Sequence, residues 1–405
     1  MSSTPPEAPD PIAAPLPSLV LEGLSVREFR NLARVDIEPA PRMNVVSGSN
    51  GHGKTSLLEA IYFAATSRSF RTHRTGDLIR HGAAVASVKA RFTEHKGDLH
   101  PLSREQTAAA SGRGCVVTLD GNKPQSLAGF ATRSPVVVFH PEEMALSTGP
   151  ASLRRKLLDR VALFINPASA DSKARYSHAI RARQELLHRK GATSTSTPTP
   201  TPTPTNAEVE AFEALAAKHG AELTRARQRA AEALTVELHA AFRQIAAPEL
   251  GLEARFQAGG SPDEAEAKET LASQRNRDAH RPSAGFGPHR DDLGLFFDGH
   301  PARLVGSQGQ HRALTLSIKA AEAAAVAAVR GLEPILLLDD VSSELDPDRT
   351  AALFQFLALA RGQIFLTTTR PDLIVTPGLD RNTRSDFRID RGASVALPKP
   401  PSSEG

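Results

Sequence analysis

Residues 45–56, VVSGSNGHGKTS, contain the pattern G-x-x-x-x-G-K-[ST] of loops that bind nucleotide phosphates. The glycines let successive backbone N–H groups face phosphate oxygens, and the N-terminus of the following helix favours the same anion. We expect Lys54 to reach the β- and γ-phosphates and the Thr55 hydroxyl to ligate Mg²⁺. The residues predicted to bind ATP here are Gly48, Ser49, Asn50, Gly51, His52, Gly53, Lys54 and Thr55.

A second motif supplies the carboxylates that such a loop requires. In PILLLDDVSSELDPDR, residues 334–349, an apolar strand ends at Asp339 and Asp340. At the carboxyl edge of a sheet, Asp339 would lie beside Mg²⁺, and Asp340 would orient or deprotonate an attacking water. Together with Lys54, these two acids are the predicted catalytic residues.

A third motif, VGSQGQHRAL at 305–314, precedes a long predicted helix and resembles the signature of ATP-binding-cassette ATPases. By that resemblance, Ser307, Gly309 and Gln310 bind the γ-phosphate held by a second copy of the chain. Taken alone, the same residues also fit a polar helix cap. The following SSELD, Ser342 to Asp346, resembles the D-loop of these ATPases.

The elements that must position these motifs predict an α/β head. Strands are expected at 21–29, 43–48, 334–340 and 363–369, and helices at 55–66 and 311–330. Because the later strands are apolar throughout, they indicate a parallel sheet covered on both faces. The predicted fold is an SMC-like P-loop ABC-type ATPase head into which a helical domain is inserted.

Two helix-rich stretches, 153–190 and 207–245, flank a Thr-Pro spacer at 193–205 that excludes regular structure. They predict either an arm that goes out and returns or an ordinary helical subdomain. The predicted organisation is a disordered tail (1–20), the first half of the head (21–140), a helical arm or lobe (141–285), the second half of the head (286–395) and a second disordered tail (396–405).

The composition sets broad limits. The 405 residues carry a net charge of +4, which permits nucleic-acid binding without demanding it, and the absence of Trp disfavours a base-stacking platform. One cysteine, Cys115, excludes an internal disulfide framework. The N-terminal residues lack the features of a secretory signal, and no apolar run approaches the ~20 residues that span a bilayer. We therefore expect a cytoplasmic protein without membrane contact.

Several motifs together resemble one family. REFRNL (27–32), GKTSLLEAIYFAATSRSFRTHRTGDLIRHG (53–82), VVVFHPEEMALSTGPASLRRKLLDR (136–160), GPHRDDL (287–293) and SQGQHRAL (307–314) are typical of the RecF family of recombination mediators. The resemblance covers about 21–389. It implies ATP-dependent binding to single-stranded, gapped or junction DNA, an ATP-driven homodimer, RecR and RecO partners, recombinase loading, replication restart and SOS induction. ATPase activity is expected to be weak and DNA-stimulated, as in a switch.

Three other classes of ATPase are alternatives. A structural DNA tether like SMC proteins is one, although the helical stretches are too short for a long coiled coil. A transporter ATPase is disfavoured because about 280 residues separate Thr55 from Ile335 and because Thr367, Thr368 and Thr369 stand where a switch histidine is expected. A nuclease-coupled ATPase would need a further cluster of metal-binding carboxylates.

Basic clusters are the candidates for DNA contact, although a charge run on a helix is also typical of a solvated face. They are Arg68, Arg71, Arg74 and Arg80; Arg154, Arg155 and Lys156; Arg181, Arg183, Arg189 and Lys190; and Arg225, Arg227 and Arg229. Arg154, Arg155 and Lys156 also fit a role in supporting the nucleotide or the dimer. In GPHRDDL, we expect Arg290 to pair with Asp291 or Asp292, either around the site or for purely structural reasons.

Overall fold

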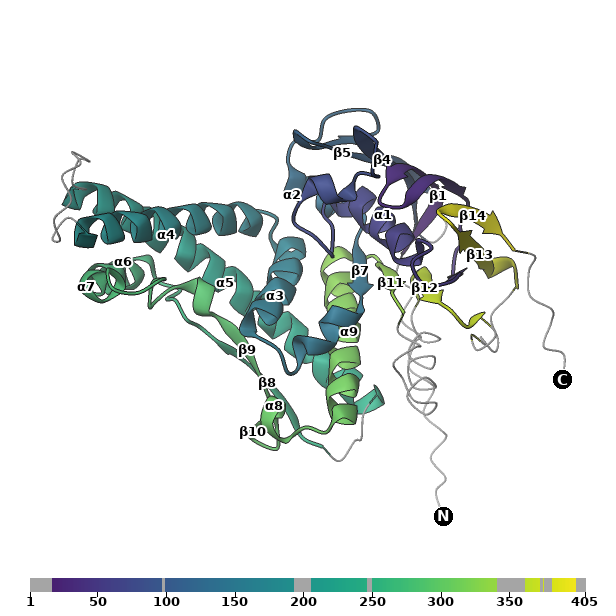
Figure 1. Ribbon diagram of the computed structural model, residues 1–405. Helices are drawn as coiled ribbons and strands as arrows, with labels where there is room; N and C mark the ends of the chain where they lie inside the picture. The colour runs from purple at the N-terminus through teal and green to yellow at the C-terminus, as the bar shows by residue number, and fades with distance from the viewer. Residues whose placement is uncertain are drawn as a thin grey trace, which may run out of the picture.

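The structure is a computed structural model that describes residues 17–96, 99–192, 205–245, 250–340, 361–371, 374 and 381–397. Four predicted segments therefore lie wholly or largely outside the described residues: the two tails, the Thr-Pro spacer and the D-loop Ser342–Asp346. The described part divides into a head, at the right of Figure 1, and a helical lobe with a projecting arm, at its left.

A six-stranded sheet forms the centre of the head. Its order is β14 (Ala393–Ala396), β13 (Arg384–Asp390), β3 (Met43–Ser47), β12 (Ile364–Thr368), β11 (Ile335–Leu338) and β7 (Val136–Phe139). All neighbouring strands are parallel except β13 and β14, which form an antiparallel hairpin. The predicted parallel sheet is confirmed, and it brings strands from both halves of the chain together.

A second sheet, which the sequence analysis did not anticipate beyond its first strand, covers helix α1 (Lys54–Thr66). It is antiparallel, with the order β2 (Leu32–Ile37), β1 (Ser18–Phe29), β4 (Val85–His95), β5 (Leu102–Ser111) and β6 (Gly114–Leu119). Helix α1 is buried between the two sheets because its central part, 57–65, is apolar apart from Glu59. Segment 27–32 comprises the end of β1, a turn and the start of β2.

The helical lobe packs around its own apolar core, to which α3, α5, α9 and β9 contribute. Its elements are η2 (Pro141–Leu146), α3 (Ala151–Ile165), α4 (Ser169–Ala192), α5 (Asn206–Ile245), β8 (Leu252–Gln257), α6 (Glu264–Ser273), α7 (Arg275–Asp278), η3 (Pro288–Arg290), β9 (Asp292–Phe297), β10 (His300–Pro301), α8 (Ala302–Val305) and α9 (Gln308–Arg330). Short elements of the head are η1 (Thr75–Leu78), α2 (Leu127–Ala131) and η5 (Arg381–Thr383).

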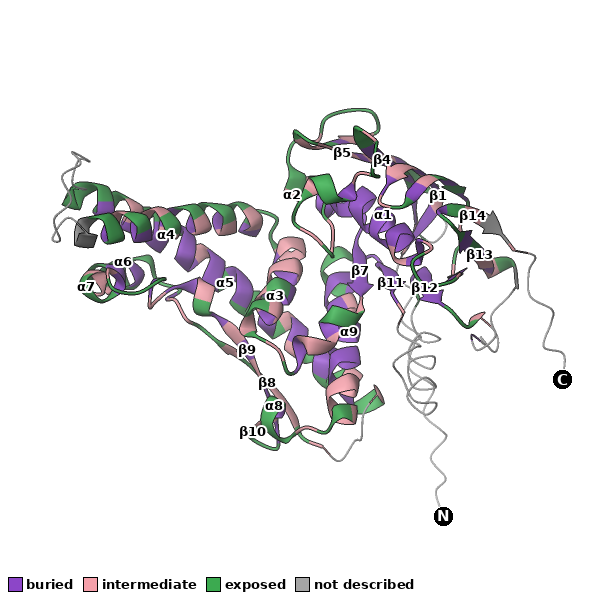
Figure 2. Cartoon of the chain, viewed as in Figure 1, coloured by how far each residue is buried: buried purple, intermediate pink, exposed green. Residues whose placement is uncertain are grey.

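The two alternatives predicted for 153–190 and 207–245, a returning arm and a helical subdomain, describe parts of the same structure. Helices α4 and α5 lie side by side, and the tip of this pair projects away from the head (Figure 1). The 40-residue helix α5 also runs back into the lobe, where it packs against α9 and α3. Figure 2 shows buried residues along much of the length of α5. The long helix thus connects the arm rigidly to the helix that carries the signature motif.

Among the described residues, no helix combines the length and apolarity needed to cross a membrane.

Candidate functional site

The phosphate loop connects β3 to α1 at the carboxyl edge of the central sheet. Its first glycine has a backbone φ of +150°, and a Cβ at Gly48 would lie 2.3 Å from the carbonyl oxygen of Ile389. A side chain would therefore be strained at this position and would also push β13 away. Gly48 thus has a backbone conformation and a close neighbour, Ile389, that both favour glycine at this position of the motif.

Lys54 lies at the start of α1 with its side chain folded over the loop. Its Nζ donates to the carbonyl oxygens of Gly48 at 2.7 Å and Ser49 at 3.2 Å. Burial lowers the pKa of Lys54, and the nearby Asp340 and Asp339 oppose that shift. The ammonium thus has oxygen partners within the loop, in the position where phosphate oxygens would replace them.

The loop and the acidic strand meet through Thr55. Its Oγ1 donates to Asp339 Oδ1 at 2.9 Å, across 284 residues of sequence. Thr367, at the end of β12, donates from its own Oγ1 to the same carboxylate oxygen at 2.8 Å. Burial raises the pKa of Asp339, and the hydrogen bonds from Thr367 and Thr55 lower it. The fold therefore brings the first turn of α1 and the ends of β11 and β12 together at one carboxylate.

Thr367 also fixes the second acid. Its Oγ1 accepts a hydrogen bond from the backbone N–H of Asp340 at 2.8 Å. Asp340 has a φ of +50°, a left-handed conformation that is uncommon outside glycine. One buried hydroxyl thus bonds to both acidic residues. In the sequence, Thr367 stands out only because it replaces the switch histidine of transporter ATPases, and its bonds to Asp339 and Asp340 were not predicted.

The signature residues form a capping box at the start of α9. Ser307 Oγ accepts from the Gln310 backbone N–H at 3.2 Å, and the Ser307 N–H donates to Gln310 Oε1 at 2.7 Å. Gly309 lies between them in the first turn, and Ser307 is exposed. In Figure 1 this end of α9 lies near α8, well away from α1. The motif and the phosphate loop are therefore not brought together within one chain.

One further residue, His140, borders Asp339. The Asp339 N–H donates to the Phe139 carbonyl at 2.8 Å, so His140, the next residue after β7, lies beside Asp339 at the sheet edge. The ring of His140 stacks on Phe70 with centroids 5.3 Å apart. Burial lowers the pKa of His140, whereas Glu143 opposes this shift. His140 and Asp339 lie far apart in the sequence, so only the parallel pairing of β7 with β11 shows that they are neighbours.

The opposite flank of the loop contacts two turns that sequence analysis also missed. Asn31, between β1 and β2, donates from Nδ2 to the Gly51 carbonyl at 2.9 Å. His52 Nδ1 lies 3.0 Å from Asp390 Oδ1, and the Gly392 N–H donates to the His52 carbonyl at 3.2 Å. Asn31 lies within the REFRNL motif, but its contact with the loop was not predicted, and the β13–β14 turn lies in no motif that the sequence analysis quoted.

A buried charge network fixes α9 against the segment that follows β7. Arg160 of α3 bonds Glu322 at 2.6 Å and Glu143 at 2.8 Å, and Lys319 of α9 contacts the same two carboxylates. Burial opposes ionisation, but Arg160 and Lys319 lower the pKa of Glu322 to about 2. The network thus connects the signature helix to the strand beside Asp339.

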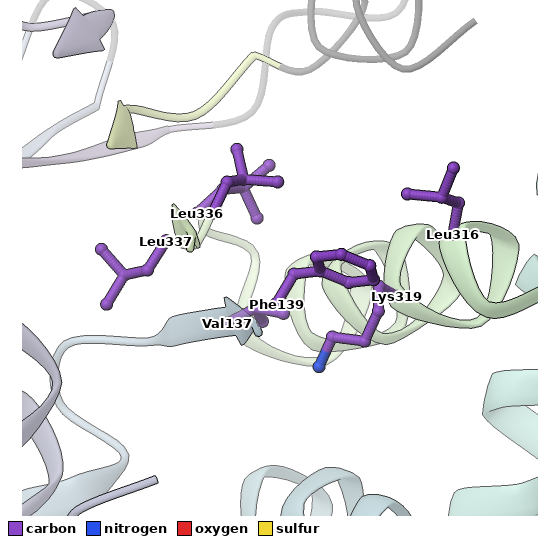
Figure 3. A pocket seen from close by; sticks show the side chains of 7 residues that line it. Val137, Phe139, Leu316, Lys319, Leu336 and Leu337 are labelled. Atoms are coloured by element: carbon purple, nitrogen blue, oxygen red, sulfur yellow. The ribbon is translucent and has the colours of Figure 1, made fainter. Parts of the chain in front are cut away.

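A small apolar cavity lies between this helix and the sheet. It has a volume of about 20 Å³ and is lined by side chains of β7, β11 and α9, with Lys319 at its edge (Figure 3). Such a volume holds about one water molecule. The cavity is too small for a nucleotide, and the candidate site is the open edge of the sheet.

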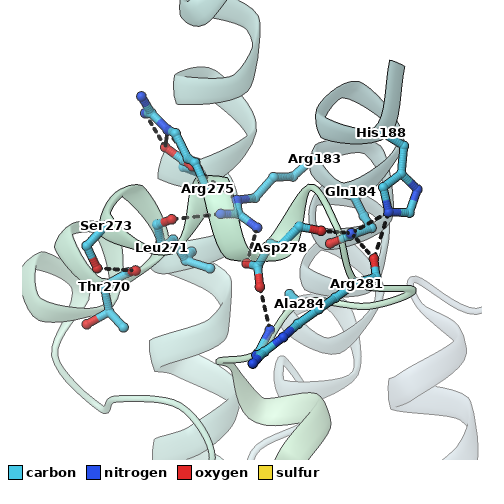
Figure 4. A network of polar contacts seen from close by, with 12 residues as sticks. Arg183, Gln184, His188, Thr270, Leu271, Ser273, Arg275, Asp278, Arg281 and Ala284 are labelled. Carbon is cyan, nitrogen blue, oxygen red and sulfur yellow. Dashed lines mark hydrogen bonds and ion pairs between the residues drawn. The ribbon is translucent and has the colours of Figure 1, made fainter. Parts of the chain in front are cut away.

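The prediction that four basic clusters are available for DNA contact needs correction. Arg154, Arg183 and Arg227 are buried and paired with carboxylates, so they are not available to DNA in this conformation. Arg183 is the clearest case: it bonds Glu213 at 3.0 Å and Asp278 at 2.8 Å, within the network drawn in Figure 4. Each of the last three clusters therefore contains a structural arginine, whereas Arg68, Arg71, Arg74 and Arg80 are all exposed.

The acids of GPHRDDL pair differently from the prediction. Asp292 bonds Arg154 at 2.8 Å, and Asp291 bonds Arg227 at 3.1 Å. Arg290 instead donates from Nε to the Ala284 carbonyl at 3.0 Å. The segment therefore joins α3 and α5 within the lobe, which favours the structural interpretation.

The residues at the sheet edge suit a magnesium ion. A hydroxyl and a carboxylate oxygen 2.9 Å apart are the hard donors that Mg²⁺ prefers, and it completes its shell with phosphates and water. Within the described ranges, no three His, Cys, Asp or Glu side chains gather into a separate metal site.

Comparisons with known proteins agree with this geometry. The family model for the RecF/RecN/SMC N-terminal domain matches residues 20–382. The chain is 39% identical over 364 residues to the DNA replication and repair protein RecF of Anaeromyxobacter sp. (strain Fw109-5), covering 87% of this chain and 93% of that one. It is 34% identical over 391 residues to RecF of Myxococcus xanthus (strain DK1622), covering 94% and 99%.

Solved structures give the same result. The recombination mediator protein RecF of the RecFOR pathway, in its ATP form, superposes with a TM-score of 0.79 at 25% identity, over 95% of this chain and all of that one. An Smc head domain of Pyrococcus furiosus, at 16% identity, has a TM-score of 0.51 over 94% of this chain and 96% of that one, which shows a shared fold alone.

Proposed function

Because this chain belongs to the RecF family of DNA replication and repair proteins, we propose that it is an ATP-dependent DNA-binding switch. One observation carries the proposal: Thr55 of the phosphate loop is hydrogen-bonded to Asp339 at the end of β11. A hydroxyl and a carboxylate from two distant motifs converge where a nucleotide's metal would bind. Related RecF structures with ATP and ATPrS support this ligand.

Each residue of the loop then has a task. The backbone N–H groups of 48–53 and the N-terminus of α1 bind phosphate oxygens. Lys54 exchanges its loop carbonyls for the β- and γ-phosphates. Thr55 and Asp339 hold Mg²⁺, which when bound offsets phosphate charge. Asp340 orients or deprotonates the attacking water.

The signature motif would act on a second molecule. Ser307 is exposed at the start of α9, and in Figure 1 this end of α9 lies near α8 and away from α1. In a head-to-head dimer, Ser307, Gly309 and Gln310 would bind the γ-phosphate on the partner. Hydrolysis then removes the shared ligand and opens the dimer. Because Asp340 is shorter than the glutamate common at this position, turnover should be slow, as in a timer.

The closed dimer would bind gapped, single-stranded or junction DNA. The biological role proposed from family membership is recombinase loading with RecR and RecO partners in repair, replication restart and SOS induction. An SMC-like DNA tether is the alternative. Helix α5, with 40 residues, is only about 60 Å long at 1.5 Å per residue, which favours the switch over a tether. A single-molecule DNA-bridging assay separates the two.

Sedimentation velocity tests the central claim. The chain should be monomeric alone and dimeric with Mg-ATP and gapped DNA when hydrolysis is blocked. A chain that stays monomeric under those conditions contradicts the proposal.

Ser307→Arg sharpens this test. It should leave ATP binding by the monomer unchanged within about twofold, because Ser307 lies outside its own loop, and it should abolish ATP-driven dimerisation. Loss of monomer binding would instead place Ser307 in the site of its own chain.

A further inference from the structure

We propose that Tyr176 and His289 form a proton-sensitive latch that holds the arm helix α4 on the lobe. Both residues lie outside the nucleotide site: Tyr176 lies in the first half of α4, and His289 lies in η3, within the GPHRDDL motif. The proposed nucleotide switch leaves this motif without a task. The latch gives the motif one, because it connects the segment that joins α3 and α5 to a helix of the arm.

Tyr176 lies in a socket formed around two glycines. The residue is only 3% exposed, and its ring stacks on the His289 ring with centroids 6.1 Å apart. A Cβ at Gly287, where φ is +134°, would lie 2.1 Å from the Tyr176 hydroxyl oxygen. A Cβ at Gly220 of α5 would lie 3.2 Å from the tyrosine ring. Glycine at 287 is therefore what leaves room for the hydroxyl.

The hydrogen bond in the socket has a defined direction while His289 is neutral. His289 Nε2 lies 2.9 Å from the Ala284 carbonyl oxygen, which can only accept, so Nε2 carries a hydrogen. Nδ1 is then bare, and at 2.6 Å it accepts from the Tyr176 hydroxyl. Among the described residues, His289 is the only hydrogen-bond partner of this hydroxyl. The latch is therefore closed in the neutral state.

Charged groups from three helices and from the motif itself face the pair. Burial lowers the pKa of His289, the hydrogen bond to the Ala284 carbonyl raises it, and the nearby arginines of the motif and of α3 lower it further. Burial also raises the pKa of Tyr176, so its hydroxyl keeps its proton at neutral pH. The charged groups are Arg290 and Asp291 of the motif, Arg155 of α3, Arg183 of α4 and Arg227 of α5.

Protonation of His289 opens the latch. A proton makes Nδ1 a donor that faces the Tyr176 O–H. The hydroxyl could accept from Nδ1 only by turning its own hydrogen away, which leaves a buried donor unpaired. The pKa of His289 is lower in the folded chain than its ordinary value of 6.5. The contact therefore stabilises the fold above about pH 6.5, and this contribution is lost as the pH falls from there through the lower folded pKa.

The motif is anchored independently of the latch, so opening loosens α4 rather than the motif. Asp291 accepts from Arg227 of α5 at 3.1 Å and from the Gly259 N–H at 2.9 Å. The second half of α4 is held by the buried network of Arg183 (Figure 4). The part that the latch controls is therefore the root of α4, residues 169–180.

Tyrosine NMR tests the control of the hydroxyl by His289. The chain has two tyrosines, so ¹³C labelling at Cζ gives two signals, and Tyr176→Phe identifies the one from Tyr176. That signal should follow a single titration with a midpoint below about pH 6.5. His289→Asn keeps an acceptor oxygen near the place of Nδ1 but cannot titrate, so it should abolish the shift. His280→Asn, which changes an exposed histidine between α7 and η3, is the control and should leave the titration unchanged.

Hydrogen exchange measures the opening itself. After correction for the intrinsic effect of pH, amides of the root of α4 should exchange about tenfold faster at about pH 5.5 than at about pH 7.5, as expected for the loss of one hydrogen bond. Amides of 183–189 should change by less than about twofold, because Arg183 holds that part of the helix. Tyr176→Phe should exchange rapidly at both pH values, and His289→Asn slowly at both.

Two results would overturn the inference. A Tyr176 signal that does not respond to pH, or responds equally after His289→Asn, would show that His289 does not control the hydroxyl. If the signal titrated while the root of α4 exchanged equally fast at both pH values, the pair would be a structural contact and not a latch.

Discussion

The sheet edge and the arm use similar polar residues for opposite purposes. At the edge, Lys54 donates to the Gly48 carbonyl and Thr55 donates to Asp339 along an open margin, where a ligand can replace or join these contacts. In the arm, Arg183 is fully buried between Glu213 and Asp278, and every contact is internal. The type of a polar residue therefore indicates its function less well than its surroundings do. A polar residue can bind a ligand only if its partners leave part of it accessible.

The largest expected effect concerns the arm. Arg183→Ala would leave two buried carboxylates without their shared cation, and the free energy of unfolding should fall by about 3–5 kcal/mol. Urea denaturation followed by circular dichroism measures it. The matched control is Arg181→Ala, an exposed neighbour on the same helix, which should change stability by less than about 0.5 kcal/mol. Similar losses in both variants would contradict the contrast.

The next effect concerns the edge. Asp340→Asn removes the proposed base, so ATP turnover should fall by about 10²–10⁴-fold, while the ATP-bound dimer accumulates. Phosphate release and sedimentation measure the two quantities. Unchanged turnover would remove the role assigned to Asp340.

A smaller effect is expected at Thr367. Thr367→Val keeps the shape and removes the hydroxyl that bonds Asp339 and Asp340. Turnover should fall by about 10- to 100-fold, because one hydrogen bond to a charged group is worth about 1.5–3 kcal/mol. Thr367→Ser keeps the hydroxyl and should restore most of the activity. If valine and serine behave alike, the hydroxyl does not position the acids.

The smallest expected effect concerns two exposed arginines of the head. Arg68→Gln combined with Arg74→Gln should reduce the salt dependence of DNA affinity by about two units, one for each lost phosphate contact. Fluorescence anisotropy at several salt concentrations measures this slope. Arg34→Gln, an exposed arginine on the antiparallel sheet, is the control. An unchanged slope would take this cluster out of the DNA interface.

Sequence analysis was most accurate where a strict local pattern exists. The helix after the phosphate loop, the apolar strands and the helix ending at Gly331 all agree with the structure within a few residues. It missed β4, although Ala86, Val88, Ala90 and Phe92 alternate with exposed residues. That period-two pattern was a usable signal for a half-buried strand.

The sequence by itself determined the family, the fold class and the three motifs, because glycine spacing, paired acids and apolar runs are local and chemically specific. Tertiary structure alone decided which cations are free to meet a ligand and which polar groups surround the loop. Arg183 and Arg181 look alike in sequence, and Asp390 lies more than three hundred residues from His52. Burial and long-range pairing arise from packing between distant segments, which no local pattern records.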